Sequence, residues 1–172
     1  MKKPSILITG TRKGIGKQLV EHYLKNGFHV IGCSRGKVDY SFENYKHFEL
    51  NITNEDSVKK MFLHLRREKV RLEILINNAG MASMNHILLT PMKKSREIFD
   101  TNFFGTFLVS REAAKIMKAN NYGRIINITT VGTRLKLEGE AIYTASKSAV
   151  ENLTIVMSRE FADYGITVNG VG

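Results

Sequence analysis

The N-terminal part of the chain places a short apolar run, a glycine-rich turn and a helical pattern in direct succession. Residues 5–9 read Ser-Ile-Leu-Ile-Thr, which is typical of a buried strand. A strand, a tight turn and a helix in this order favour an α/β fold in which the strand belongs to a parallel sheet. The helical pattern ends at Gly27, and its apolar positions are Ile15, Leu19, Val20, Tyr23 and Leu24.

Three glycines, at positions 10, 14 and 16, occupy the turn between this strand and this helix. Glycine permits a tight turn and lets the backbone approach a ligand closely. The free amides and the dipole of a helix N-terminus attract phosphate groups. A βα turn without a ligand is the alternative, but the strand-turn-helix context favours binding. We therefore expect a phosphate-bearing cofactor to contact Gly10, Thr11, Arg12, Lys13, Gly14, Ile15 and Gly16.

Strands and helices alternate along the rest of the chain, which predicts a single domain over residues 1–172 with right-handed crossovers. Residues 36–46 are too few and too polar for a full crossover helix, and residues 131–140 are expected to be a loop. Asn54 is expected to cap a helix that follows it. Residues 81–95 are expected to form a loop and a short helix with Pro91 in its first turn, and longer helices are expected over about 96–120 and 142–164. Further strands are expected at residues 28–33, 47–51, 72–76, 124–128 and 166–169.

Residues that suit a dinucleotide follow the second and the fourth predicted strands. The carboxyl ends of parallel strands share one edge, where such a sheet binds its ligand. After the second strand, an acidic residue would bond the adenosine ribose, whereas an arginine suits a 2′-phosphate. This chain has Arg35 there, and Lys13 adds a second cation, so both favour NADP(H) over NAD(H). The alternative is that Arg35 is an ordinary loop arginine and that residues 77–80, Asn-Asn-Ala-Gly, are simply a turn.

Tyr143 and Lys147 stand four residues apart in a predicted helix and therefore lie on one face, about one turn from each other. A free phenol has a pKa of about 10, and a nearby positive charge lowers that value. The pair is suited to donating or accepting a proton near neutral pH. On spacing alone, a solvated helix face is the alternative.

Charge and composition limit the partners of the chain. Its formal net charge is +10, but no basic tract exceeds two residues. We therefore expect the positive charge to serve an anionic cofactor or substrate. Nucleic-acid binding through a basic patch is the alternative interpretation, and we do not expect it. No apolar run is long enough to span a membrane. The single cysteine, Cys33, cannot form an internal disulfide, which fits a reducing compartment, so the expected location is the cytoplasm. No metal site is expected.

Taken together, these motifs resemble the short-chain dehydrogenase/reductase family over essentially the whole chain. The resemblance rests on the glycine turn, on residues 77–80, on Asn102 within Thr-Asn-Phe-Phe-Gly, and on the pair Tyr143 and Lys147. Residues 123–126 and 165–169 are similar to the 3-oxoacyl-acyl-carrier-protein reductase type. The resemblance implies a Rossmann-like doubly wound parallel sheet of six strands in the order 3-2-1-4-5-6.

The resemblance also implies a reaction, namely hydride transfer between NADP(H) and a carbonyl or alcohol carbon. It implies that Tyr143 gives the carbonyl oxygen its proton and that Lys147 lowers the tyrosine pKa and bonds the nicotinamide ribose. Thr130 would position and polarise the carbonyl, and Asn102 would hold a water that passes protons to Lys147. The implied substrate is a small carbonyl or alcohol compound, anionic or acyl-carrier-linked. Further cofactor contacts are implied for Asn51, Ile52, Asn78, Ala79, Gly80, Tyr143 and Lys147.

Two features depart from the pattern of the family. The family has a serine thirteen residues before the tyrosine, and this chain has Thr130, whose extra methyl makes χ1 stiffer. The sequence also ends before the substrate lid and the last strand of the family. A nucleotide-binding protein without turnover is therefore the rival function.

The helices expected over residues 96–120 and 142–164 carry more apolar residues than one buried face needs. The family packs these two helices across a two-fold axis, and an isologous dimer is the commonest assembly. We expect a homodimer or homotetramer, although all these residues could instead face their own sheet. The residues concerned are Phe103, Phe104, Phe107, Ala145, Val150, Leu153 and Val156.

Overall fold

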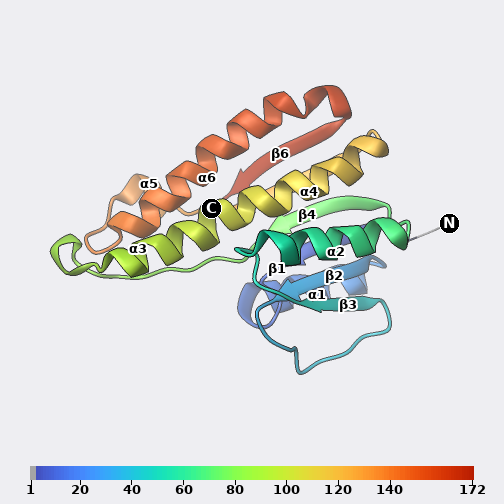
Figure 1. Ribbon diagram of the computed structural model, residues 1–172, viewed down its shortest axis with the longest axis horizontal. Coiled ribbons are helices and arrows are strands. Elements are labelled where there is room, and N and C mark those ends of the chain that lie inside the picture. Colours follow the sequence, from blue (N-terminus) through green and yellow to red (C-terminus); the bar gives the residue numbers. More distant parts are fainter. Residues whose placement is uncertain (1–2) are drawn as a thin grey trace.

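The computed structural model describes residues 3–172, which contain a six-stranded sheet in the order β3-β2-β1-β4-β5-β6 (Figure 1). Every neighbouring pair of strands is parallel, which confirms the predicted fold class and strand order. From β1 the chain moves outward to β3 and then returns to pair β4 with β1, so the strand order reverses between these two strands. The strands are β1 (Ser5–Thr9), β2 (His29–Ser34), β3 (Tyr45–Glu49), β4 (Leu72–Asn77), β5 (Gly123–Ile128) and β6 (Ile166–Val171).

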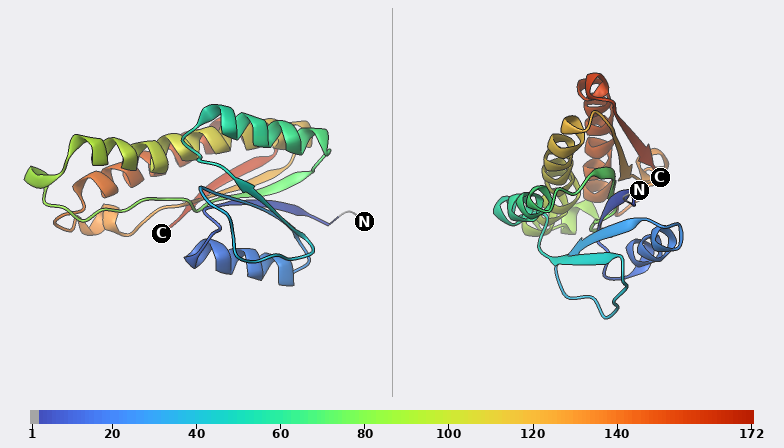
Figure 2. Two further views of the ribbon diagram at one scale, coloured as in Figure 1. Left: turned by 60° about the horizontal axis from the view of Figure 1, so that its bottom comes forward. Right: turned by 90° about the vertical axis from the view of Figure 1, so that its right-hand side faces the viewer.

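Helices cover both faces of the sheet, but unequally. Figure 2 shows α2, α4 and α6 on one face and α1 on the other. The α-helices are α1 (Gly14–Lys25), α2 (Glu55–Arg67), α3 (Met92–Phe99), α4 (Gly105–Ala119), α5 (Gly132–Leu135) and α6 (Ala141–Glu160). The remaining helical segments are the 3₁₀ turns η1 (Ile87–Leu89) and η3 (Ala162–Tyr164) and the π-helical segment η2 (Asp100–Phe104), which joins α3 to α4.

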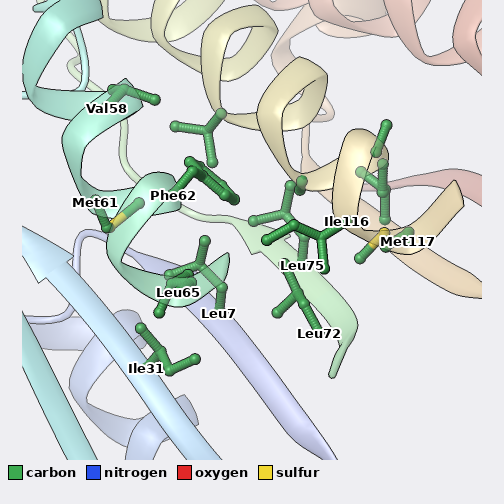
Figure 3. Close-up of a cluster of buried hydrophobic side chains, with 14 of the residues drawn as sticks. Leu7, Ile31, Val58, Met61, Phe62, Leu65, Leu72, Leu75, Ile116 and Met117 are labelled. Carbon is green, nitrogen blue, oxygen red and sulfur yellow. The ribbon is translucent and has the colours of Figure 1, made fainter. Parts of the chain in front are cut away.

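The core has two layers, one on each face of the sheet, and β1, whose residues are all buried, contributes to both. Leu7 packs into the cluster under α2, α4 and α6, whereas Ile6 and Ile8 pack into the cluster under α1. Figure 3 shows Leu7 with Phe62 and Leu65 of α2 and with side chains of β4 and α4 in the larger cluster. Burial on both faces explains why the interior of β1 is a continuous apolar run without polar alternation.

Three local predictions were wrong. The third strand spans Tyr45–Glu49 instead of 47–51, because this edge strand has mostly half-buried side chains and no strong apolar run. Residues 131–140 contain the short helix α5, which has too few residues to produce a periodic pattern. The long helix ending at Ala119 is interrupted by η2, for which the sequence offers no signal. The predicted cap was confirmed, since Asn54 Oδ1 accepts a hydrogen bond from the Ser57 amide at 2.8 Å.

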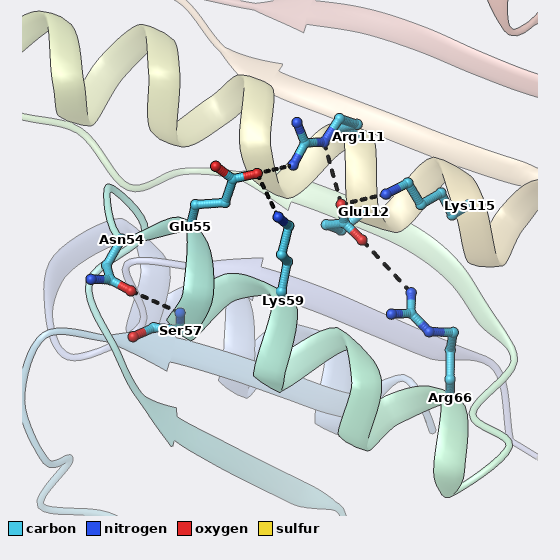
Figure 4. A network of polar contacts seen from close by, with 8 residues as sticks. All are labelled: Asn54, Glu55, Ser57, Lys59, Arg66, Arg111, Glu112 and Lys115. Carbon is cyan, nitrogen blue, oxygen red and sulfur yellow. Dashed lines mark hydrogen bonds and ion pairs between the residues drawn. The ribbon is translucent and has the colours of Figure 1, made fainter.

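Ion pairs join α2 to α4 around one buried carboxylate, Glu112, which is 2% exposed (Figure 4). Glu112 Oε1 accepts from Lys115 Nζ at 2.6 Å and from Arg111 Nε at 3.3 Å, and Arg66 Nη1 lies 3.7 Å from Oε2. Burial raises the pKa of Glu112, but the contacts with Lys115 and Arg111 outweigh it, so the net pKa is lowered. Ionised Glu112 therefore stabilises the fold above its unfolded pKa of about 4.3, and this contribution is lost as the pH falls through the folded value.

We expect Glu112→Gln to lower the free energy of unfolding at pH 7 by about 1–2 kcal/mol, because its partners are only partly exposed. The difference from wild type should shrink as the pH falls below about 4.3, where the unfolded chain takes up a proton on Glu112, and should vanish below the lowered folded pKa. Urea denaturation at both pH values measures this. The matched control is Glu55→Gln on α2, whose side chain is 47% exposed and pairs with Lys59 and Arg111. Equal losses at the two positions would contradict the role of burial.

Candidate functional site

The turn between β1 and α1 has the conformation of an anion cradle. Gly10 and Gly14 have φ values of +75° and +59°, a region that strains other residues. A Cβ on Gly16 would lie 2.2 Å from the carbonyl oxygen of Gly10, so α1 can approach the turn only with glycine at this position. Lys13 caps α1 without a side-chain hydrogen bond, and the first turn of α1 has no acidic residue. The first amides of α1 are therefore available to an anion.

The end of β4 is fastened to the same turn. Thr9 Oγ1 accepts hydrogen bonds from the backbone amides of Asn78 and Ala79, at 3.0 and 2.9 Å. Asn78 Nδ2 donates to the carbonyl oxygens of Thr9 and Gly10, at 2.9 and 3.3 Å. The two loops that leave β1 and β4 are thus held at a fixed separation.

A cleft of about 360 Å³ opens at this edge of the sheet. Its lining includes eleven predicted cofactor positions: Gly10, Arg12, Lys13, Ile15, Gly16, Arg35, Asn51, Ile52, Asn78, Ala79 and Gly80. The lining residues that the sequence did not indicate are Cys33, Ser34, Leu50, Met81 and Thr101. The side chain of Cys33 is fully buried, and burial raises the pKa of its thiol to about 12. None of these lining residues is acidic, so the cleft favours an anion.

Four predicted cofactor positions do not line this cleft. Thr11 is fully buried, and its Oγ1 accepts from the Tyr45 hydroxyl at 3.0 Å, behind the turn. Gly14 contributes its backbone conformation at the start of α1. Tyr143 and Lys147 lie on α6, beyond the end of the cleft marked by Gly80, where a Cβ would be 3.7 Å from Lys147 Nζ.

The cationic end of the cleft lies over the ends of β1 and β2. Arg12, Lys13 and Arg35 are all exposed and all line the cleft. The guanidinium of Arg12 lies beside Gly36, since a Cβ on this glycine would be 3.2 Å from Arg12 Nη1. Within residues 3–172 no ion pair neutralises these three side chains.

Lys147 occupies the opposite end of the site. Only 6% of Lys147 is exposed, and Nζ donates to the carbonyl oxygen of Ile128 at 2.6 Å, at the carboxyl end of β5. Burial lowers the pKa of Lys147. Tyr143 lies one helical turn earlier on α6 and is half-buried. The helix thus brings a phenol and a desolvated ammonium group to the same edge of the sheet as the cleft.

The amide of Asn102, in the π-helical segment η2, ties three elements together. Its Oδ1 accepts from the Met81 amide at 2.7 Å, and its Nδ2 donates to the Met81 carbonyl at 2.9 Å. The same Nδ2 donates to Ser146 Oγ at 2.9 Å, and Ser146 Oγ donates to the Tyr143 carbonyl at 2.6 Å. Both N–H groups of Asn102 are therefore used inside the protein. Sequence reasoning missed Ser146, whose only signal was a small hydroxyl residue beside Lys147.

Thr130 is half-buried in the loop that follows β5. Its Oγ1 accepts from the Gly132 amide at 3.2 Å, and its carbonyl accepts from Thr133 Oγ1 at 3.0 Å. These contacts fix the loop but leave the hydroxyl proton of Thr130 available to an acceptor outside the loop.

Among residues 3–172 there is no group of three or more His, Cys, Asp or Glu side chains arranged to hold a metal ion. Within the same range, none of the helices has the length and apolarity needed to cross a bilayer.

A parallel sheet with a glycine turn and a cleft at the point where the strand order reverses defines a nucleotide-binding domain of the Rossmann class. A family model described as short chain dehydrogenase matches residues 4–172. The 3-oxoacyl-(acyl-carrier-protein) reductase FabG of Vibrio cholerae serotype O1 is 33% identical over 171 residues, which are 96% of this chain and 70% of that protein. The reductase of the same name from Escherichia coli K12 is 32% identical, with the same coverage.

Solved structures give the same result. The structure of ElxO with NADP bound superposes with a TM-score of 0.93 at 32% identity, over 99% of this chain and 73% of that one. A 4-hydroxyisoleucine dehydrogenase complexed with NADH and succinate gives 0.87 at 31% identity, over 96% and 77% of the two chains. The chain belongs to the short chain dehydrogenase family, which is a family of oxidoreductases.

Proposed function

We propose that the chain is an NADP(H)-preferring oxidoreductase that interconverts a carbonyl and a secondary alcohol. The observation that carries the proposal is the state of Lys147, a buried ammonium group held 2.6 Å from the Ile128 carbonyl and one turn after Tyr143. A lysine is rarely buried without an ionic partner unless its charge is used. Here it stands beside a half-buried phenol at the end of a cleft that suits an anionic dinucleotide.

The residues of the cleft fit a dinucleotide. The uncapped start of α1 and the glycine turn suit a pyrophosphate, and the small residues Ala79 and Gly80 leave room for a ring at the end of β4. Bound there, a nicotinamide cofactor would supply or accept the hydride. Cys33, Leu50 and Ile52 give the cleft an apolar floor, which limits the access of water.

Each residue at the reaction end has a proposed role. Tyr143 would donate the proton that a carbonyl oxygen needs on reduction, and accept it in the reverse direction. Lys147 would favour the ionised form of the phenol and has N–H groups beyond the bond to Ile128 for a sugar hydroxyl. Thr130 would donate its hydroxyl proton to the substrate oxygen. Because both N–H groups of Asn102 are used, a water on Asn102 would have to bond Oδ1 or the backbone.

The preference for NADP(H) is supported by the three unpaired cations at the adenosine end of the cleft, Arg12, Lys13 and Arg35. An ionised 2′-phosphate would gain charge-assisted hydrogen bonds there, and a ribose hydroxyl would gain less. Names of structural relatives include both NADP and NADH complexes, so they favour a nicotinamide cofactor without separating the two forms.

Titration of both cofactors tests this preference. We expect wild-type protein to bind NADPH more tightly than NADH, and Arg35→Ala to weaken NADPH binding by about 1.5–3 kcal/mol while NADH changes little. The matched control is Lys37→Ala, an exposed cation of the same loop that does not line the cleft. Tighter binding of NADH by wild type, or the same loss in the control, would contradict the proposal.

Substitution of the phenol tests the chemistry. We expect Tyr143→Phe to lower the rate of NADPH oxidation with a 3-oxoacyl thioester by about 10²–10⁴, because it removes only the proton donor, and to leave cofactor affinity nearly unchanged. Thr130→Ser is the companion variant and should raise the rate if the methyl group hinders the hydroxyl. Equal turnover by wild type and Tyr143→Phe would refute the assignment. NADPH binding without any oxidation by wild type would favour the rival, a nucleotide-binding protein without turnover.

The names of the curated relatives support 3-oxoacyl compounds linked to an acyl carrier as the first substrate class to test.

Self-association through α4 and α6 is a further part of the proposal. Of the residues expected there, Val150 is buried and Leu153 packs against the core, so neither faces outward. The exposed large apolar residues of η2, α4 and α6 are Phe104, Phe107, Ile155 and Val156, and Ala145 on α6 is also exposed.

We expect light scattering to give the mass of a dimer or tetramer at micromolar concentration. Ile155→Glu should lower that mass, because it introduces a charge on a side chain that is 54% exposed on α6. Leu63→Glu on α2 is the control, since Leu63 is 42% exposed but lies away from the proposed interface. A monomeric wild type, or equal effects of both variants, would count against this surface.

A further inference from the structure

The connection between β2 and β3 is unusually short and is held in place by side chains. Residues 35–44 join two parallel strands without a helix, whereas such crossovers normally take a dozen or more residues. Tyr40 anchors the middle of the loop, because its hydroxyl donates to the Thr11 carbonyl at 2.5 Å. Its ring stacks on Tyr45 of β3, with the ring centroids 5.4 Å apart. The loop that carries Arg35 is therefore fastened to the glycine turn.

His47 of β3 fixes the start of this loop. Its Nε2 lies 3.2 Å from Ser34 Oγ and 3.2 Å from the Gly36 carbonyl oxygen. Ser34 Oγ itself donates to the same carbonyl at 2.7 Å. Because a carbonyl oxygen only accepts, His47 bonds Gly36 in the tautomer that carries the ring proton on Nε2. One histidine thus contacts the residues on both sides of Arg35.

The other ring nitrogen of His47 joins the glycine turn. Nδ1 lies 2.9 Å from the Tyr45 hydroxyl and 3.4 Å from Thr11 Oγ1. The Tyr45 hydroxyl can lie there because position 32 is glycine, where a Cβ would be only 2.2 Å from it. Burial lowers the pKa of His47, which favours the neutral ring at pH 7. A network of half-buried polar contacts thus holds the segment Ser34–Gly36, whose cation in the cleft is Arg35.

We propose that His47 is a positioning residue that sets cofactor discrimination by holding the segment Ser34–Gly36, and with it Arg35, at the cationic end of the cleft. This inference rests on the proposed function, since it needs Arg35 to contact a 2′-phosphate. Arg12, beside Gly36, gains from the same fixed backbone. His47 does not line the cleft, so it acts through the segment and not on the cofactor.

The test compares His47→Phe, which keeps a ring but removes both nitrogens, with His47→Gln, whose amide can still donate to the Gly36 carbonyl. Calorimetry with NADPH and NADH gives two dissociation constants for each variant. We expect His47→Phe to weaken NADPH binding about three- to tenfold, the effect of one net hydrogen bond, with NADH within about twofold of wild type. His47→Gln should recover most of the lost NADPH affinity. His47→Leu replaces His47→Phe if the phenyl ring prevents folding.

A double-mutant cycle with Arg35→Ala separates this inference from the proposed function. If His47 acts through Arg35, the loss of NADPH affinity caused by Arg35→Ala should be smaller in the His47→Phe background than in wild type. A selective loss in Arg35→Ala but none in His47→Phe would overturn the positioning role and leave the cofactor proposal intact. No selective loss in Arg35→Ala would instead refute the cofactor preference. Equal weakening of both cofactors by His47→Phe would show a purely structural histidine.

Discussion

The arrangement of the site depends on two hydrogen bonds to the hydroxyl oxygen of Thr9. This oxygen accepts hydrogen bonds from the backbone amides of Asn78 and Ala79. These bonds fix the end of β4 against the end of β1, at the point where the strand order reverses. Loops on either side of such a point leave in opposite directions, and a cleft opens between them. The glycines let the N-terminus of α1, with its free amides, approach that cleft. The side chain of Asn78 holds the turn in place by donating a hydrogen bond to the Gly10 carbonyl oxygen. The cleft is in this sense a consequence of sheet topology that a few hydrogen bonds make rigid.

A π-helical segment within the helical stretch from α3 to α4 organises the end of the site that carries Tyr143 and Lys147. The π-helical segment η2 carries Asn102, whose amide contacts Met81 after β4 and Ser146 on α6. Such single-turn bulges are frequent at functional sites, because they re-aim one side chain without ending the helix. Here the bulge links the helix of Tyr143 and Lys147 to the strand end that borders the cleft. The positions of the phenol and the ammonium group relative to the cleft therefore depend on Asn102.

The sequence predicted what is encoded locally. The strand-turn-helix unit, the spacing of Tyr143 and Lys147 and the cation at Arg35 are patterns within a few residues, and they gave the fold class and most of the cleft lining. Contacts between distant residues were beyond its reach. The orientation of the Thr11 side chain is one example, since it faces Tyr45, 34 residues away. The partner of Asn102 on α6 lies 44 residues along the chain, and no propensity indicates it or the bulge that makes it possible.

Cys33 gives the molecule a property unrelated to catalysis. It is the single cysteine of the sequence, is fully buried in β2 and has a pKa of about 12, so its thiolate is almost absent in the folded state at neutral pH. Alkylating reagents attack thiolates, and an unfolded chain would present this one with an ordinary pKa of about 8.5. The rate of labelling therefore reports how often the sheet between β1 and β3 opens. Labelling of this native thiol therefore measures local opening of the half of the domain that contains β1–β3, without any engineered probe.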